Sequence, residues 1–147
     1  MTNVEITDEA GFLRTLRRLA HQILENNPEP ETLILAGIRR RGVPLARQLA
    51  GLMEQFGGVR PQVETLDITL YRDDLSELSA QPDVRAPQFS VPVEGKTVIL
   101  VDDVIYTGRT ARAAMDAVIH LGRPARIRLA VMVDRGHREL PIDPEYV

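Results

Sequence analysis

The strongest constraint on the fold is one stretch, residues 98–110, in which an apolar run ends abruptly in two acids. Residues 98–101 read VILV and are followed directly by Asp102 and Asp103. An uninterrupted apolar run of this length is typical of a central strand in a parallel sheet, which is buried on both faces. Ligands bind at the carboxyl ends of the strands in such sheets, so the position of the two acids predicts a binding site.

The residues after the acids have the character of an anion-binding loop that leads into a helix. They are Val104, Ile105, Tyr106, Thr107, Gly108, Arg109 and Thr110. Unpaired N–H groups and the dipole at a helix N-terminus both favour a phosphate, and Gly108 allows a positive φ or a close backbone approach. Adjacent carboxylates would repel a phosphate, but they are suited to accept hydrogen bonds from the hydroxyls of a ribose. A plain strand-end turn with a helix cap would explain only part of this pattern.

The rest of the chain alternates strand and helix patterns. We expect Thr7 to cap a first helix, whose apolar residues recur at helical spacing from Phe12 to Leu24 before residues 26–28 end it. The other predicted elements are strands at 32–36, 63–71, 97–101 and 127–133 and helices at 44–55 and 110–121. This order predicts an α/β fold with a central, mostly parallel sheet flanked by helices, in a single domain over residues 1–147.

The amino-acid composition limits the kinds of site and partner that the chain can have. The chain has 147 residues, 44% of them hydrophobic, which suits one compact domain. It has no cysteine, so disulfides and thiolate metal sites are excluded. A net charge of -3 gives no overall signal for nucleic acid, so such binding would need a local basic patch. With no signal peptide and no long apolar run, we expect a cytoplasmic protein without membrane contact.

Two further segments are polar and are candidates for ligand binding. Arg39, Arg40, Arg41 and Gly42 follow a predicted strand, and guanidinium groups are strong phosphate partners. A solvated basic turn is the simpler alternative. Residues 72–92 form a polar connection that contains two prolines and is long enough to indicate a functional loop.

These segments together resemble type I phosphoribosyltransferases, and within them the PyrR family of pyrimidine operon attenuation regulators and uracil phosphoribosyltransferases. The resemblance rests on residues 18–21 (RLAH), 37–42 (GIRRRG), 66–75 (LDITLYRDDL), 98–110 and 133–142 (VDRGHRELPI), in the family's order. Segments 66–75 and 133–142 separate this family from purine and orotate transferases. The resemblance implies the type I phosphoribosyltransferase fold, with a flexible loop and a small hood.

The same resemblance implies how 5-phosphoribosyl-1-pyrophosphate (PRPP) binds. Asp102 and Asp103 would hold the ribose hydroxyls, loop 104–110 the 5′-phosphate and loop 37–42 the pyrophosphate. Mg²⁺ would bind through PRPP oxygens, with no direct protein ligand assigned. Uracil would displace pyrophosphate to give UMP. No residue stands out as a general base, so we expect catalysis mainly from positioning and charge stabilisation.

Other roles follow from the family's loop and hood. Tyr71, Arg72 and Asp73 would begin the flexible loop that closes over the substrate. Asp134 and Arg135 would lie near the uracil in the hood, although a strand-end turn explains them equally well. The alternatives are a transferase for another base, orotate or hypoxanthine, or a nucleotide-sensing RNA regulator with little catalysis. We expect a homodimer or homotetramer.

The family's second function is binding of an mRNA hairpin, promoted by UMP or UTP. The residues carried over to that role are Arg18, His21, His137 and Arg138. Arg14 and Arg17 share the helical face of Arg18, although a solvated face is the simpler interpretation. Asp143 stands where the family has a basic residue, and the chain stops at Val147 where relatives continue. Two alternatives follow: a C-terminal segment is missing from this sequence, or the protein lacks it, in which case hood closure and RNA binding would both be weaker.

Overall fold

The computed structural model describes residues 8–71 and 88–147. Arg72 and Asp73 therefore lie outside the described residues, as does Thr7. Within the described part of the chain, no helix is long and apolar enough to cross a membrane.

The core of the fold is a four-stranded parallel sheet in the order β2-β1-β3-β4. The strands are β1 (Leu33–Ile38), β2 (Gln62–Leu66), β3 (Thr97–Ile105) and β4 (Arg126–Asp134). In the middle of the sheet, Gly37 of β1 is in register with Val101 of β3, which is in register with Ala130 of β4. All six residues of β1 are buried, as expected for a strand covered on both faces. The predicted parallel α/β architecture is confirmed.

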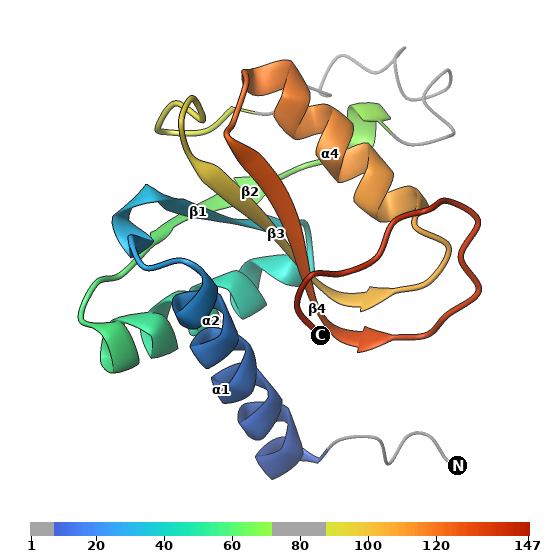
Figure 1. The fold of residues 1–147 in the computed structure, drawn as a ribbon. Helices are drawn as coiled ribbons and strands as arrows, with labels where there is room; N and C mark the ends of the chain where they lie inside the picture. Colours follow the sequence, from blue (N-terminus) through green and yellow to red (C-terminus); the bar gives the residue numbers. More distant parts are fainter. Residues whose placement is uncertain (1–7, 72–87) are drawn as a thin grey trace.

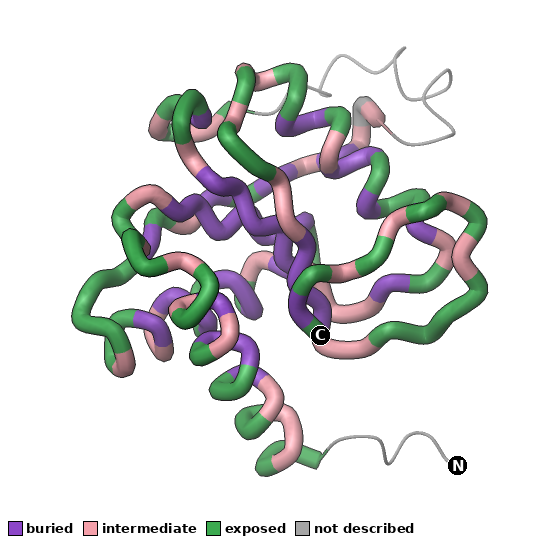
Figure 2. Tube along the Cα trace, in the orientation of Figure 1, coloured by how far each residue is buried: buried purple, intermediate pink, exposed green. Residues whose placement is uncertain are grey.

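Helices cover both faces of the sheet (Figure 1). Helices α1 (Glu9–Asn26) and α2 (Gly42–Gly57) pack together on one face, and α4 (Arg109–Leu121) covers the other. Two short 3₁₀ turns complete the fold, η2 (Pro30–Thr32) and η3 (Thr69–Tyr71). Figure 2 shows the buried residues along the strands and on the helix faces turned toward them, so the core consists of two apolar layers separated by the sheet.

The connections diverge between the two central strands. From β1 the chain passes through α2 to the edge strand β2, whereas from β3 it passes through α4, on the opposite face, to the edge strand β4. The loops after β1 and β3 therefore leave in opposite directions, which opens a crevice at their carboxyl ends. This topology places the segment after Ile38 beside the end of β3.

The first helix begins with a different cap from the one predicted. The carboxylate of Asp8 accepts a hydrogen bond from the backbone N–H of Gly11 at 2.7 Å, so Asp8 is the N-cap. The predicted cap, Thr7, lies outside the described residues. An aspartate one position later satisfies the same unpaired donors at the start of the helix.

Two predicted strand boundaries were also wrong. The strand predicted at 63–71 ends at Leu66, because the Asp67 carboxylate accepts hydrogen bonds from the backbone N–H and the hydroxyl of Thr69 and turns the chain into η3. The strand predicted at 97–101 continues to Ile105, because β4 pairs with it over that whole length. Asp102 and Asp103 thus lie within the final part of β3.

Candidate active site

A polar basin of about 850 Å³ lies at the carboxyl ends of β1, β2 and β3. The residues that line it are Arg39, Arg40, Arg41, Asp67, Thr69, Asp102, Asp103 and Thr110. They come from the segments after β1 and β2, from the end of β3 and from the start of α4, and the sheet topology brings them together. Six of the eight are residues predicted from the sequence to form the site.

The two acids of β3 form the floor of the basin and interact with each other. The backbone N–H of Asp103 donates to the Asp102 carboxylate at 2.8 Å, and Arg41 Nη1 lies 3.3 Å from Asp103 Oδ2. Burial raises the pKa of Asp102 from its usual 3.8 to about 7. This value is the net result, because the Asp103 carboxylate also raises the pKa whereas the Asp103 backbone N–H and the charge of Arg41 lower it. One member of the pair is therefore close to half-protonated at neutral pH.

The arginine loop is held against the end of β3 by backbone contact. A Cβ on Gly42 would overlap the carbonyl oxygen of Val101, and a Cβ on Gly37 would lie 2.6 Å from the carbonyl oxygen of Gly42. Glycine is therefore required at both ends of the loop. The Arg39 backbone N–H donates to the Leu66 carbonyl at 2.9 Å, which ties the start of the loop to the end of β2.

Asp67 and Thr69 belong to the basin but were not predicted as site residues. Burial acts to raise the pKa of Asp67, but hydrogen bonds from Thr69 and the charge of Arg39 lower it overall. Arg39 Nη1 lies 3.4 Å from Asp67 Oδ2. The signal in the sequence was an acid directly after the residue at which β2 ends, Leu66. It was hidden because 63–71 was interpreted as one continuous strand.

The predicted phosphate loop begins later than expected. Val104 and Ile105 are still in β3, and Ile105 is buried in the apolar core beneath α4. The turn itself starts at Tyr106 and leads through Gly108, which has φ 96° and caps α4. A side chain would be strained in this conformation. Residues 106–108 therefore form the turn between β3 and α4, and Thr110 of α4 lines the basin.

Residues 134–143, here called the hood segment, pack against this loop. The backbone N–H groups of Glu139 and Leu140 both donate to the carbonyl of Thr107, at 2.8 and 3.2 Å. Arg109 and Glu139 form an ion pair at 2.7 Å. The hood segment and the phosphate loop thus touch through backbone and side chains.

The two predicted base contacts lie at the junction between the hood segment and the phosphate loop. The guanidinium of Arg135 lies 5.0 Å above the ring of Tyr106, which is 45% exposed. The backbone N–H of Arg135 donates to the Ile105 carbonyl at 2.9 Å. The carboxylate of Asp134 is engaged by Arg138, whose guanidinium lowers the Asp134 pKa.

The remaining predicted residues lie elsewhere. Tyr71 packs against the core beside His120, with ring centroids 6.0 Å apart, and burial together with Asp116 raises its pKa. Arg18 and His21 are exposed on α1, where Arg18 donates to the Val147 carbonyl at 2.6 Å. His137 is exposed and lies beside Tyr106. None of these four residues lines the basin.

The donor set of the basin suits a divalent cation only in combination with ligand oxygens. Within residues 8–71 and 88–147, no group of three or more His, Cys, Asp or Glu side chains is placed to hold a metal ion. The hard oxygens of Asp102 and Asp103 are ligands that Mg²⁺ accepts, but Mg²⁺ needs further oxygens to complete its octahedron. PRPP carries such oxygens on its ribose and pyrophosphate.

Comparisons with known proteins agree with this geometry. Residues 3–147 match the phosphoribosyl transferase domain family. The chain is 56% identical over 142 residues to the bifunctional protein PyrR of Clostridium novyi (strain NT), covering 97% of this chain and 80% of that relative. It is 57% identical over 143 residues to the bifunctional protein PyrR of Pelotomaculum thermopropionicum, covering 97% of this chain and 79% of that relative.

Solved structures agree on the fold. A hypoxanthine phosphoribosyltransferase from Staphylococcus aureus superimposes with a TM-score of 0.73 at 15% identity, covering 97% of this chain and 74% of that one. A purine phosphoribosyltransferase from Pyrococcus horikoshii gives a TM-score of 0.68 at 20% identity, covering 95% and 82%. At these identities the likeness extends to the fold alone.

Proposed function

This chain belongs to the PyrR family of phosphoribosyltransferases, which are bifunctional pyrimidine regulators with uracil phosphoribosyltransferase activity, and we propose that the strand-end basin is where PRPP and uracil react. The proposal rests on one observation: three kinds of phosphate- or hydroxyl-binding group line the same basin. An acid pair, an arginine loop and the start of a helix line the same space. These groups match the ribose diol, the pyrophosphate and the 5′-phosphate of PRPP.

The proposal gives each of these groups a role. The ribose hydroxyls donate hydrogen bonds to Asp102 and Asp103, and the 5′-phosphate accepts from the backbone of loop 106–110. The pyrophosphate lies against Arg39, Arg40 and Arg41, whose charges stabilise it as it leaves. The C1–O bond to pyrophosphate breaks, the bond from C1 to the uracil nitrogen forms, and that nitrogen loses its proton. Positive charge builds on the ribose, and the carboxylates beside it stabilise that charge.

Mg²⁺ fits as a companion of PRPP, where it would neutralise the leaving pyrophosphate. Asp102 and Asp103 would contact it at most together with oxygens of the substrate. The protein's own contribution is to hold the ribose and the two phosphate groups in fixed positions. Orientation of this kind accounts for much of the rate enhancement when no strong general base is present.

Uracil would bind between the acid pair and the hood segment. Tyr106, with Arg135 above its ring, borders this space. The backbone groups of the hood segment offer donors and acceptors to the uracil edge. Selection of uracil over orotate or hypoxanthine is therefore a property of the hood segment, whereas the basin is common to all phosphoribosyl transfer.

The test is UMP formation from PRPP and uracil in the presence of Mg²⁺, with orotate and hypoxanthine in parallel. We expect turnover with uracil alone and its loss in Asp103→Asn. The matched control is Asp116→Asn, which changes an exposed acid on α4 and should keep full activity. Turnover with another base but not with uracil would contradict the base assignment. UMP binding without turnover would instead indicate a nucleotide-sensing regulator.

The second function of the family, RNA binding, is favoured by one surface. Arg14, Arg17, Arg18 and His21 are all exposed along α1. A row of cations of this kind can bind RNA phosphates through release of counterions. With an RNA hairpin from the leader of the pyrimidine operon, Arg17→Gln should lower both affinity and its salt dependence, and UMP should raise affinity. Equal binding by wild type and Arg17→Gln would remove α1 from the interface.

A further inference from the structure

Every hydrogen-bond donor of the Arg138 guanidinium has an acceptor within the protein. Nε donates to the carbonyl of Ile142 at 2.6 Å. Nη1 donates to the Tyr106 carbonyl at 3.1 Å and to Asp134 Oδ1 at 2.9 Å. Nη2 donates to Asp134 Oδ2 at 2.8 Å and to Asp143 Oδ1 at 3.2 Å. An arginine has five N–H donors, so the set is complete.

Because all its N–H donors have acceptors, Arg138 differs from the exposed arginines of the protein. Its side chain is only 18% exposed, whereas that of Arg41 is 83% exposed. The bidentate contact with Asp134 has the parallel geometry that makes arginine–carboxylate pairs strong and directional. An RNA phosphate could bind Arg138 only by displacing one of these acceptors. The guanidinium is therefore built into the protein as an internal link.

The contact with Tyr106 has a consequence for the phosphate loop. In a trans peptide the C=O and the following N–H point in opposite directions. Because Arg138 holds the Tyr106 carbonyl, the N–H of Thr107 is turned away from the hood segment. The Thr107 carbonyl is held in the same way by the N–H groups of Glu139 and Leu140, which turns the N–H of Gly108 outward as well. Two successive N–H groups are thereby aligned for an anion.

We propose that Arg138 is a positioning residue for the phosphate subsite: it holds the Tyr106 carbonyl and so presets the loop N–H groups that bind the 5′-phosphate. This inference rests on the proposed function of the basin. It assigns Arg138 a role inside the enzyme in place of the RNA contact predicted from the resemblance. Arg138 would thus act together with the backbone contacts of Glu139 and Leu140 to couple the phosphate loop to the hood segment.

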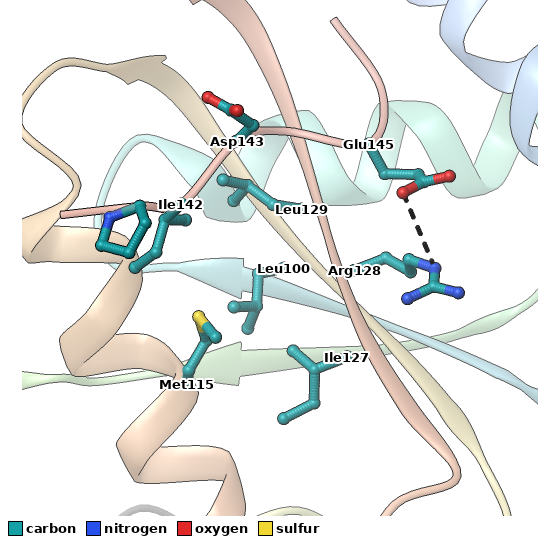
Figure 3. Close-up of a pocket in the computed structure, with 9 residues that line it drawn as sticks. Leu100, Met115, Ile127, Arg128, Leu129, Ile142, Asp143 and Glu145 are labelled. Atoms are coloured by element: carbon teal, nitrogen blue, oxygen red, sulfur yellow. Dashed lines mark ion pairs between the residues drawn. The ribbon is translucent and has the colours of Figure 1, made fainter. Parts of the chain in front are cut away.

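The packing beneath the hood segment explains why a polar link is needed there. A cavity of about 230 Å³ lies between this segment, α4 and β4. Figure 3 shows Leu100, Met115, Leu129 and Ile142 around this space, with Asp143 pointing away from them. This space is open to solvent, so apolar contact below the segment is incomplete. The hydrogen bonds of Arg138 supply the fixed geometry that close packing does not.

The experiment compares binding of UMP and uridine, two ligands that differ only in the phosphate. Titration calorimetry gives the ratio of the uridine Kd to the UMP Kd for the wild type, Arg138→Met, Arg138→Lys and Arg128→Met. Arg128 is a suitable control because it forms a long ion pair with Glu145, at 3.9 Å, outside the basin. We expect the ratio to fall at least tenfold in Arg138→Met, to fall partly in Arg138→Lys and to stay unchanged in Arg128→Met.

Kinetics give a second readout. If Arg138 presets the phosphate loop, the KM for PRPP should rise more than kcat falls in Arg138→Met. Loss of fold alone would lower the active fraction and leave KM unchanged. If thermal unfolding shows that Arg138→Met does not fold, the Kd ratio of Arg138→Lys becomes the test. A wild-type ratio in the folded variant would overturn the proposal, whereas a wild type that binds UMP no better than uridine would contradict the proposed function itself.

Discussion

Replacing Asp102 by asparagine is expected to stabilise the protein at neutral and alkaline pH while it removes the carboxylate proposed to hold the ribose. Burial and the adjacent Asp103 raise the Asp102 pKa from 3.8 to about 7. The folded protein therefore binds this proton more tightly than the unfolded chain does. Stability falls as pH rises from about 4 to about 7 and changes no further above that range. Asparagine keeps an oxygen for the N–H of Asp103 and has no charge to bury.

The size of the expected change in stability follows from the pKa shift of Asp102. Each pKa unit corresponds to about 1.4 kcal/mol, so a shift of about three units costs at most about 4 kcal/mol once the group is fully ionised. Most of this change, about 3 kcal/mol, falls between pH 5 and pH 8. Asp102 is half-buried, and solvent screens part of its charge. We therefore expect Asp102→Asn to gain about 1–2 kcal/mol over the wild type between pH 5 and pH 8.

The assay is urea unfolding of both proteins at pH 5, 6, 7 and 8, with Asp116→Asn as the matched control. The free energy of unfolding should diverge between Asp102→Asn and the wild type as pH rises. In a parallel thermal unfolding experiment at pH 8, the melting temperatures should differ by about 5 °C. Uracil phosphoribosyltransferase activity should be lost in the same variant. Parallel stability curves for the two proteins would refute the argument that burial of Asp102 is costly. Retained activity would refute its role at the ribose.

Two further substitutions test the scaffold of the site. Gly42→Ala places a methyl group against the Val101 carbonyl, which is backbone and cannot move aside, so we expect loss of PRPP binding and a lower melting temperature by about 5–10 °C. Calorimetry with PRPP and thermal unfolding check both effects, and an unchanged affinity would show that the arginine loop tolerates displacement. Asp8→Ala removes the N-cap of α1 and should cost about 1 kcal/mol in urea unfolding without changing turnover. A change in turnover would mean that the start of α1 contributes to the active site.

The site residues that could be recognised from sequence share one property. Asp102 and Asp103 follow an apolar run that only a central strand explains, and Arg39 follows another. A strand end is a local signal, because apolar periodicity and the polar residues that interrupt it lie within a few positions of each other. Asp67 was missed because the alternation of apolar and polar residues continues past it, as it would in a longer strand. The strand ends there because the Asp67 carboxylate accepts a hydrogen bond from the backbone N–H of Thr69, which turns the chain.

The amino-acid sequence by itself determined the order of strands and helices, the parallel sheet and the family, since these depend on local patterns and on motifs within single segments. The tertiary structure alone decided how far β3 extends, because strand length is set by pairing with β4. It also decided the raised pKa of Asp102 and the hydrogen-bond partners of Arg138. The burial of a side chain and the number of its hydrogen-bond partners depend on residues that are distant in the sequence. A motif names the side chain, but its charge state and its partners depend on what the fold packs around it.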